Sequence, residues 1–381
     1  MILHYVMKPL RTYVMIRNFA LNLSQPFIAF VSAASGISGE NLAIVSSAGS
    51  ALPSFIQFVM GFFNLRGKII TFYGTLAAGL LWISLSFIPF GVFFVVIYVL
   101  LEASLGISAY GWYLIMERVS NTSRGKILAQ YSFYSVIGGM IATLLTGFVV
   151  NKDFSEVRYF FFFSGSLFLL SSLISLKFDV DYSKEPLKGL SLNKELSKFL
   201  IITFLFDVVW SMAWPLFPLA QVYLFDMNFE NIAIINLIAN FSTLLLQRKI
   251  GELVDKNRKL MMFLGRLALS VFPLAYALST SVYEIYLANV VAGFTSSINS
   301  TAYLSYIYDN SKDVRKGIGL YNAVSGLGDL IGSSIGMLGI EELEFLGMVI
   351  AIKLMMLIIA SLRMVASFVY LKIQEVKPVK F

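Results

Sequence analysis

Twelve apolar runs, each close to the length of a membrane-spanning helix, constrain this 381-residue chain more than any other feature. A helix needs about 20 predominantly apolar residues to cross the hydrocarbon core of a bilayer. A buried helix of a water-soluble protein would seldom repeat that length twelve times. The sequence therefore predicts an all-α, polytopic membrane protein with twelve transmembrane helices. We expect these helices at residues 12–34, 42–63, 69–88, 91–116, 126–150, 158–177, 197–224, 231–247, 260–280, 284–307, 317–340 and 345–371.

The composition agrees with a bilayer environment and argues against several kinds of chemical site. Hydrophobic residues make up 58% of the chain and charged residues 13%, and the mean hydropathy is +0.79. A soluble domain is about half apolar and about a quarter charged. The single histidine, His4, and the absence of cysteine argue against a zinc site, a cysteine nucleophile, a disulfide framework and a histidine-based triad. We therefore expect no metal, no cofactor and no enzymatic activity.

The basic residues are distributed unequally between the two sets of loops. Twelve spans place both termini on one side of the membrane, and 23 of the 29 Lys and Arg residues fall on that side. Only Lys152 and Arg158 fall in the opposite loops, and the other four lie inside spans. An excess of Lys and Arg marks cytoplasmic loops. We therefore expect a cell-membrane protein with both termini in the cytoplasm, whose net charge of +7 needs no nucleic-acid partner.

A weak internal repeat divides the chain into two halves. The only long polar connection, residues 179–196, separates six apolar runs from six. Parallel repeats of six helices are a recurring plan of membrane transporters. We expect two pseudo-symmetric six-helix bundles, residues 1–178 and 197–381, joined by a cytoplasmic linker. At an offset of 190 residues the coinciding positions are Gln57 and Gly61 with Gln247 and Gly251, Arg66 and Lys68 with Lys256 and Arg258, and Tyr131 and Gly138 with Tyr321 and Gly328.

A charged loop in the second half carries a family motif. Residues 251–259, "GELVDKNRK", resemble the loop G-x-x-x-D-R/K-x-G-R-R/K of the major facilitator superfamily, and they lie between the second and third spans of their half, as in that family. The first-half copy is degraded, because Leu65 stands where the Asp would be. The resemblance implies a secondary transporter that moves a small-molecule substrate across the bilayer by alternating access, with protons as the candidate coupling ion. We expect it to be a monomer.

The same loop is a candidate cytoplasmic gate, formed by Gly251, Asp255 and Arg258. A glycine at this position permits close approach of helices at a membrane boundary. An Asp can face the positive end of a neighbouring helix, an interaction worth about 0.3–1 kcal/mol when exposed. In the family that it resembles, this Asp bridges the two halves, and pseudo-symmetry would place its partner around residues 123–126. The alternative is a solvated turn whose basic residues only anchor the cytoplasmic side.

Polar residues form helical stripes on the first, fourth, seventh and tenth runs. The resemblance implies that these four helices line a central substrate cavity. The spacing keeps each set on one helix face, which is consistent with a cavity. The alternative is that single Ser and Asn side chains hold helices together through hydrogen bonds worth about 0.6–2 kcal/mol each. The candidate cavity residues are Asn18, Asn22, Gln25, Trp112, Ser211, Trp214, Gln221, Asn289, Ser296 and Tyr303.

Seven ionisable residues lie inside the expected spans, where each charge costs at least about 2.5–3.5 kcal/mol at the bilayer centre. Lys353 and Arg363 lie near span ends, so we expect their side chains to extend to the interface, and Arg17 and Arg266 could do the same. The candidates for proton coupling or buried charge are Glu102, Asp207, Arg17 and Asp329. Arg17 and Asp207 are one repeat apart and could pair across the halves. Glu102 is the preferred proton carrier, and purely structural pairing is the alternative.

Departures from familiar patterns leave the substrate open. Glu102 stands four residues before Gly106, where drug–proton antiporters of the superfamily usually carry an Arg, and the sugar-porter signature is absent. The spacing Gly328-x-x-x-Gly332-x-x-x-Gly336 predicts tight packing of the eleventh helix against a neighbour. Two other functional classes are alternatives to transport: a non-transporting membrane sensor on the same scaffold, and an intramembrane aspartyl protease, which is suggested by the G-x-G-D sequence that ends at Asp329 and by the Tyr-Asp pair that ends at Asp309.

Overall fold

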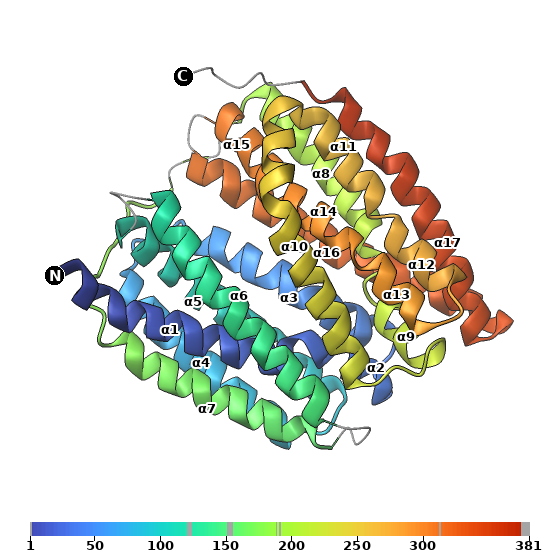
Figure 1. Cartoon of the computed structure of the whole chain (residues 1–381), viewed down its shortest axis with the longest axis horizontal. Coiled ribbons are helices and arrows are strands. Elements are labelled where there is room, and N and C mark those ends of the chain that lie inside the picture. The colour runs from blue at the N-terminus through green and yellow to red at the C-terminus, as the bar shows by residue number, and fades with distance from the viewer. Residues whose placement is uncertain are drawn as a thin grey trace. The chain divides into compact units, whose positions relative to one another are not determined.

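The computed structural model describes residues 2–119, 124–150, 155–187, 189, 192–311 and 314–374. Within these residues the chain is helical and has no named strand, apart from one isolated bridge between Arg66 and Ser183. Each of the twelve expected spans coincides with one helix or with two or more consecutive helices (Figure 1). The all-α architecture predicted from the apolar runs is therefore confirmed.

The first six spans are built mostly from long helices. The first span is interrupted near Pro26, where a short 3₁₀ turn separates two α-helices, because proline removes a backbone donor and crowds the preceding turn. The other five spans are single helices. The elements are α1 (Ile2–Ser24), η1 (Gln25–Phe27), α2 (Ile28–Ala34), α3 (Gly39–Met60), α4 (Gly67–Phe87), α5 (Val92–Val119), α6 (Arg124–Val149) and α7 (Val157–Ser175).

The second six spans are interrupted more often. The seventh span breaks before Pro215, the ninth breaks at residues 269–270, shortly before Pro273, and the tenth contains a π-helical stretch. Wide π turns occur frequently at functional sites. The elements are α8 (Lys194–Ser211), α9 (Leu216–Tyr223), α10 (Phe229–Lys256), α11 (Arg258–Ala268), α12 (Val271–Leu278), α13 (Val282–Ala288), α14 (Val291–Ile298), η2 (Asn299–Tyr303), α15 (Leu304–Asn310), α16 (Val314–Leu343), η3 (Glu344–Leu346), α17 (Met348–Ser367) and η4 (Phe368–Lys372).

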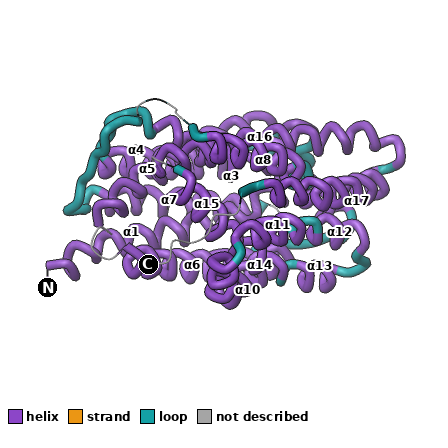
Figure 2. Tube along the Cα trace, turned by 90° about the horizontal axis from the view of Figure 1, so that it is seen from above, coloured by secondary structure: helices purple, strands orange, loops and turns teal. Residues whose placement is uncertain are grey.

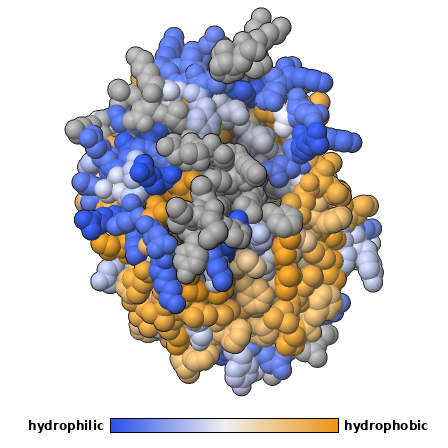
Figure 3. All heavy atoms as spheres, turned by 60° about the vertical axis from the view of Figure 1, so that its left-hand side comes forward, coloured by the Kyte–Doolittle hydropathy of each residue, from blue (hydrophilic) through white to orange (hydrophobic). Residues whose placement is uncertain are grey.

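Many of these helices are long and apolar enough to cross a bilayer. In the part of the chain that the structure describes, nine helical segments meet that requirement by length and composition, and Tyr134–Val149 is a shorter apolar helix. Large apolar side chains such as Phe93, Tyr159 and Phe345 are 76–81% exposed. Figure 3 shows one face on which apolar side chains form a broad continuous area beside a hydrophilic region. The protein is a multi-pass membrane protein whose apolar surface faces lipid.

The helices form two compact units. Unit 1 comprises Met1–Ile37, Ala48–Lys188 and Asn228–Ala233, and unit 2 comprises Ser38–Ser47, Gly189–Met227 and Ile234–Phe381. In unit 1, α4 packs against α5 and α7, and α1 packs against α6 and α7. In unit 2, α8 packs against α16 and α17, and α17 also packs against α11 and α12. Figure 2 shows these elements as helices joined mostly by short loops.

The glycines of α16 lie directly against α8. A Cβ atom built at Gly328 would lie 3.2 Å from the Cβ of Asp207, and one at Gly336 would overlap the main chain of Met212. Ser211 on α8 donates a hydrogen bond to the Gly328 carbonyl at 3.2 Å. The small-residue face predicted from the sequence is confirmed, and it brings α16 against the helix that carries Asp207.

The first part of the linker is bound to unit 1. The backbone N–H of Gly67 donates to the Tyr182 carbonyl at 2.8 Å, and that of Leu187 donates to the Gly61 carbonyl at 3.0 Å. Lys184 forms an ion pair with Glu117 at the end of α5. These contacts hold the linker across the loop between α3 and α4, where the first-half copy of the charged motif is degraded.

Candidate functional site

A buried ion pair joins two helices of unit 2. Nη2 of Arg266, on α11, lies 3.3 Å from Oδ1 of Asp207, on α8, and the two side chains are only 3% and 0% exposed. Oδ1 of Asp207 accepts no hydrogen bond from the described residues, so its contact with Arg266 is electrostatic. Ser325 on α16 donates a hydrogen bond to Oδ2 of Asp207. An isolated charge is costly inside a membrane, so the ion pair and the serine together account for the retention of both charges.

Aromatic rings surround the buried arginine. The guanidinium carbon of Arg266 lies 4.4 Å from the ring centre of Tyr303, 4.6 Å from Phe206, 5.4 Å from Tyr370 and 5.5 Å from Trp210. A cation within about 6 Å of an aromatic ring face is attracted by its quadrupole. The rings come from α8, η2 and η4, so helices from three parts of the half fix the position of this cation.

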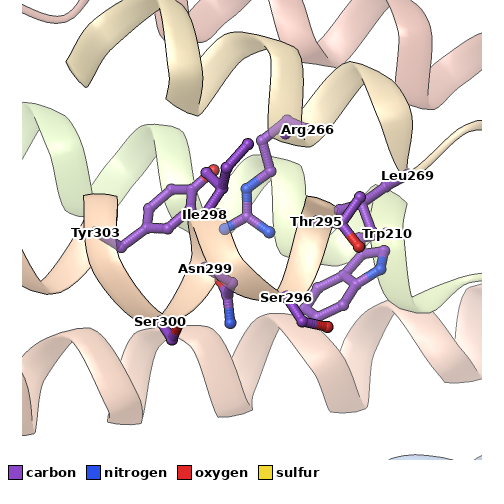
Figure 4. Close-up of a pocket in the computed structure, with 10 residues that line it drawn as sticks. Trp210, Arg266, Leu269, Thr295, Ser296, Ile298, Asn299, Ser300 and Tyr303 are labelled. Carbon is purple, nitrogen blue, oxygen red and sulfur yellow. The ribbon is translucent and has the colours of Figure 1, made fainter. Parts of the chain in front are cut away.

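The arginine faces a cavity of about 180 Å³ (Figure 4). Figure 4 shows its side chain reaching from α11 toward the helix formed by α14 and η2. The exposed residues Ser296, Asn299 and Ser300 carry polar groups along that helix. The widened π turn at Asn299–Tyr303 changes the register of side chains there, as π turns do. The cavity is lined by Trp210, Gly265, Arg266, Leu269, Thr295, Ser296, Ile298, Asn299, Ser300 and Tyr303.

A second cavity of about 350 Å³ adjoins the first in unit 2. Trp210, Leu269, Thr295 and Ser296 line both cavities. The remaining residues of the second cavity come from α9, α10, α12, α14, α17 and the turn segments beside them. They are Trp214, Phe217, Gln221, Ile235, Phe272, Tyr276, Asn289, Ala292 and Arg363.

A buried carboxyl group lies in unit 1, beside the break in the first span. Glu102 on α5 is 1% exposed, and its Oε1 accepts a hydrogen bond from Nε2 of Gln25 at 2.5 Å. The same Gln25 nitrogen donates to the Tyr98 hydroxyl at 3.0 Å. A Cβ at Gly49 of α3 would lie 2.8 Å from that nitrogen, so glycine allows α3 to approach the cluster. Both residues that share this hydrogen-bond cluster with Glu102, Gln25 and Tyr98, are neutral.

Unit 1 also contains a cavity of about 260 Å³, which Arg17 lines. Aromatic rings form much of its wall: Trp112 lies 5.1 Å from Tyr13 and 5.8 Å from Tyr131, measured between ring centres. Each unit therefore places an arginine beside aromatic rings and an open volume. The cavity is lined by Tyr13, Val14, Arg17, Asn18, Trp112, Met116, Tyr131 and Ser135.

The family model described as Major Facilitator Superfamily matches residues 13–332 and, in a second match, residues 199–380. The chain belongs to the Major Facilitator Superfamily. Membership makes it a secondary transporter of the alternating-access type and not an enzyme. A search of the curated proteins found no match to this sequence.

Solved structures share the superfamily fold at low sequence identity. A mutant of the nucleoside transporter NupG has a TM-score of 0.79 and 12% identity, covering 97% of this chain and 99% of that one. The tetrameric PepTSo2 has a TM-score of 0.75 and 11% identity, covering 97% of each chain. A POT family transporter in complex with a thioalcohol conjugated peptide has a TM-score of 0.73 and 13% identity, covering 96% and 95%. At this identity the likeness establishes the fold alone.

The structure corrects two expectations about charge in this superfamily member. Arg266 and Ser325 bind the oxygens of Asp207 within unit 2, and the pairing of Asp207 with Arg17 across the halves stays a prediction. Arg266 and Arg363 do not extend to the interface, since they are 2% and 0% exposed. Arg363 donates instead to the main-chain carbonyls of Leu269 and Trp210. Both arginines lie near span ends in sequence, but their partners come from distant segments that the apolar runs do not relate.

The ten candidate cavity residues fall into different environments. Seven line cavities within one unit: Asn18 and Trp112 in unit 1, and Trp214, Gln221, Asn289, Ser296 and Tyr303 in unit 2. Asn22 donates to the Asn18 carbonyl of its own helix at 2.8 Å. Gln25 binds Glu102, and Ser211 packs against α16. For these last three, hydrogen bonding between or along helices describes the observed role.

The superfamily loop motif has a different environment from the one expected. Arg258 is 7% exposed and forms an ion pair with Asp309 of α15. Asp255 is exposed and makes no hydrogen bond or ion pair within the described part of the chain. A Cβ at Gly251 would meet no described atom within 4 Å, so the close helix approach that a glycine permits there stays a prediction. The expected Asp255 partner around 123–126 includes Ser123, which lies outside the described residues.

The same ion pair bears on the protease alternative. An intramembrane aspartyl protease needs two carboxylates that share a proton, whereas the carboxylate of Asp309 forms an ion pair with the Arg258 guanidinium. Asp329 is 2% exposed on α16, the helix whose glycines pack against α8. Superfamily membership and this arrangement leave both acids without a catalytic role.

Several residues that complete the sites were not predicted from the sequence. Trp210 lines both cavities of unit 2, and its spacing of four residues from Trp214 was a signal that the two rings share a helix face. Asn299 stands in the π-helical stretch, and no simple sequence pattern marks that turn. Tyr276 accepts a hydrogen bond from Gln221 at 3.1 Å, a contact that required the fold.

Proposed function

We propose that this superfamily member moves a small polar solute with a flat or apolar part across the cell membrane. The halves 1–178 and 197–381 act as the two moving bodies, and both termini are cytoplasmic. One observation supports this proposal above the others: the Asp207–Arg266 pair borders a cavity lined by aromatic rings and uncharged polar groups. Rings would contact the apolar part of a solute, and the polar groups would orient it.

The solutes named for the fold relatives give a first test panel. Those relatives are described as transporters of nucleosides and peptides, and both kinds of molecule combine flat or apolar parts with hydrogen-bonding groups. We propose one chain as the working transporter, because each of the three cavities is lined within a single unit. Light scattering of the purified protein measures the oligomeric state.

Proton coupling is the proposed energy source. Glu102 and Asp207 are buried carboxyl groups in unit 1 and unit 2, and the groups that hold them differ. Glu102 accepts from the neutral Gln25, whereas Asp207 faces the Arg266 cation. A carboxyl group held by neutral donors can gain and lose a proton without breaking an ion pair. Glu102 is therefore the proposed carrier, and Asp207, Arg17 and Asp329 are proposed to set the charge of the interior.

The charged loop is proposed to act as a gate on the cytoplasmic side. Asp255 is exposed at the end of α10, where it is available to the opposite half in a closed state. Asp255→Ala would then shift the population toward cytoplasm-open states, because a contact made in only one state has been removed. Cysteine probes in the cavities should become more reactive from that side. Equal reactivity in the variant and the parent protein would leave a solvated turn as the correct description.

Transport itself is tested on purified protein. A ligand-dependent thermal-shift screen identifies stabilising solutes, because a ligand of the native state raises stability by mass action. Counterflow of those solutes in liposomes then tests flux. Asn299→Ala should raise KM by about two- to tenfold, the loss expected of one hydrogen bond. Ser361→Ala, on the exposed side of α17, is the matched control and should leave KM unchanged. A stabilising solute that shows no counterflow would identify a sensor instead of a transporter.

A further inference from the structure

We propose that the 350 Å³ cavity of unit 2 binds a carboxylate-bearing solute with an aromatic or other flat apolar body, whose carboxylate pairs with Arg363. This inference rests on the proposed function, because it names the chemical class of the transported solute. The cavity adjoins the one beside Arg266, so a molecule bound there also reaches the polar groups of α14.

The charge of the cavity favours an anion. None of its thirteen described lining residues is an Asp or Glu, and Arg363 is its one basic residue. The other buried arginine of this unit, Arg266, already has Asp207 as its counter-ion. Opposite charges attract more strongly in the membrane interior than in water. An incoming carboxylate would therefore supply the counter-ion that the described lining of this cavity does not contain.

Arg363 retains donors for such a ligand. Its Nη1 donates to the Leu269 carbonyl at 2.6 Å, and its Nη2 donates to the Trp210 carbonyl. A guanidinium group has five N–H donors in a planar fork. The Nε atom is buried and has no hydrogen-bond partner in the described structure. The group is thus fixed in position by two carbonyls while part of its hydrogen-bonding capacity remains for a ligand.

Two helix breaks place this arginine. Leu269 immediately follows the end of α11, and Trp210 lies in the last turn of α8, so Arg363 binds carbonyls at two helix C-termini. The negative ends of helix dipoles stabilise a cation. A neutral side chain could also donate hydrogen bonds to these two carbonyls, so the carbonyls alone do not explain why the residue is an arginine. A buried charge in a membrane protein usually has a functional partner. The carbonyls account for the position of the side chain, and a carboxylate accounts for its charge.

The walls of the cavity specify the rest of the ligand. Trp210 and Trp214 pack edge to face with ring centres 5.1 Å apart, and Phe217 lies 5.1 Å from Tyr276. Such surfaces stack on flat apolar groups. The volume of about 350 Å³ falls at the lower end of the range for small-molecule sites, which begins near about 300 Å³. A small aromatic acid satisfies the charge, the shape and the size together.

The test compares two probes that differ only in charge, 3-phenylpropionate and 3-phenylpropionamide. Binding to the full-length protein in detergent is followed by tryptophan fluorescence, since two of the four tryptophans line this cavity. We expect saturable binding of the acid, at least tenfold tighter than that of the amide. Arg363→Gln should remove the difference between the probes. Equal affinity of the parent protein for both probes, or no saturable binding of the acid at millimolar concentration, would overturn the assignment.

A second variant tests the same site in case Arg363→Gln does not fold. Ala292→Phe places a ring in the cavity and leaves the arginine and its two carbonyls in place, so it should abolish binding of the acid while the protein stays folded. Retained binding of the acid in this folded variant would show that the acid binds outside this cavity and would contradict the assignment. Counterflow in liposomes separates the two proposals. Acid binding without any flux contradicts the transport proposal alone, whereas flux of neutral solutes without acid binding contradicts only this inference.

Discussion

Gln25 and Glu102 are joined by a hydrogen bond of 2.5 Å that links the break in the first span to the middle of α5. Gln25 occupies the first position of the 3₁₀ turn, immediately before Pro26. A carboxyl group that changes its protonation would change the strength of this bond at a point where the helix is already interrupted. The proposed protonation of Glu102 would therefore act on helix geometry in unit 1.

Glu102→Gln should abolish accumulation driven by a pH gradient while leaving substrate exchange largely intact. Glutamine keeps the size of the side chain and cannot titrate, and exchange needs conformational change but no net proton movement. The measurement is uptake into liposomes with and without a pH gradient. Glu230→Gln is the control, because Glu230 is exposed in the first turn of α10. Continued accumulation in the Glu102 variant would make this residue structural and direct attention to Asp207.

Asp207→Asn should destabilise the protein strongly. Removing one member of a buried ion pair leaves the other charge without compensation, which typically costs about 3–5 kcal/mol. Thermal unfolding in detergent, followed by tryptophan fluorescence, measures the loss as a lower Tm. Asp255→Asn removes an exposed carboxylate and should leave Tm unchanged. The double variant Asp207→Asn with Arg266→Gln should recover part of the lost stability, and a double variant worse than either single one would contradict the pairing.

Gly61→Val should release the linker from unit 1. A Cβ at Gly61 would lie 3.0 Å from the Leu187 side chain and 3.1 Å from the Phe58 carbonyl, so valine must displace the buried leucine. Limited trypsin digestion should then cut after Lys184 several-fold faster. Gly251→Val is the matched control, since Gly251 is the repeat equivalent and has open space around it. Equal cleavage of the two variants would show that the contact with Gly61 does not hold the linker.

Cysteine labelling tests the orientation of the chain, which contains no native cysteine. Ser183→Cys lies in the linker, and Ser155→Cys lies in the loop before α7, and both positions are exposed. The excess of basic residues on the side of the termini predicts that this side is cytoplasmic. An impermeant thiol reagent added to intact cells should label position 155 and leave position 183 unlabelled. Labelling of position 183 alone would invert the topology.

The sequence by itself determined the α-helical state and the positions of the apolar spans. Apolar runs of spanning length fix the α-helical state, because backbone groups inside a bilayer must hydrogen-bond within their own segment. The glycine spacing on α16 likewise sufficed to predict tight packing, because glycines four residues apart share a helix face and leave it flat. The loop motif and the long linker identified the superfamily before any contact was known.

Only the tertiary structure decided the partners of the buried charges. Asp207 is 59 residues from Arg266, and Arg363 is 94 residues from Leu269, so no local pattern relates them. Symmetry between the halves suggests Arg17 as one possible partner of Asp207, whereas the counter-ion that the structure shows, Arg266, lies 3.3 Å away within the same unit. Helix spacing defines which residues share a face. Whether that face meets lipid, a cavity or a counter-ion depends on how the broken helices of unit 2 pack, and that packing follows from contacts between distant segments.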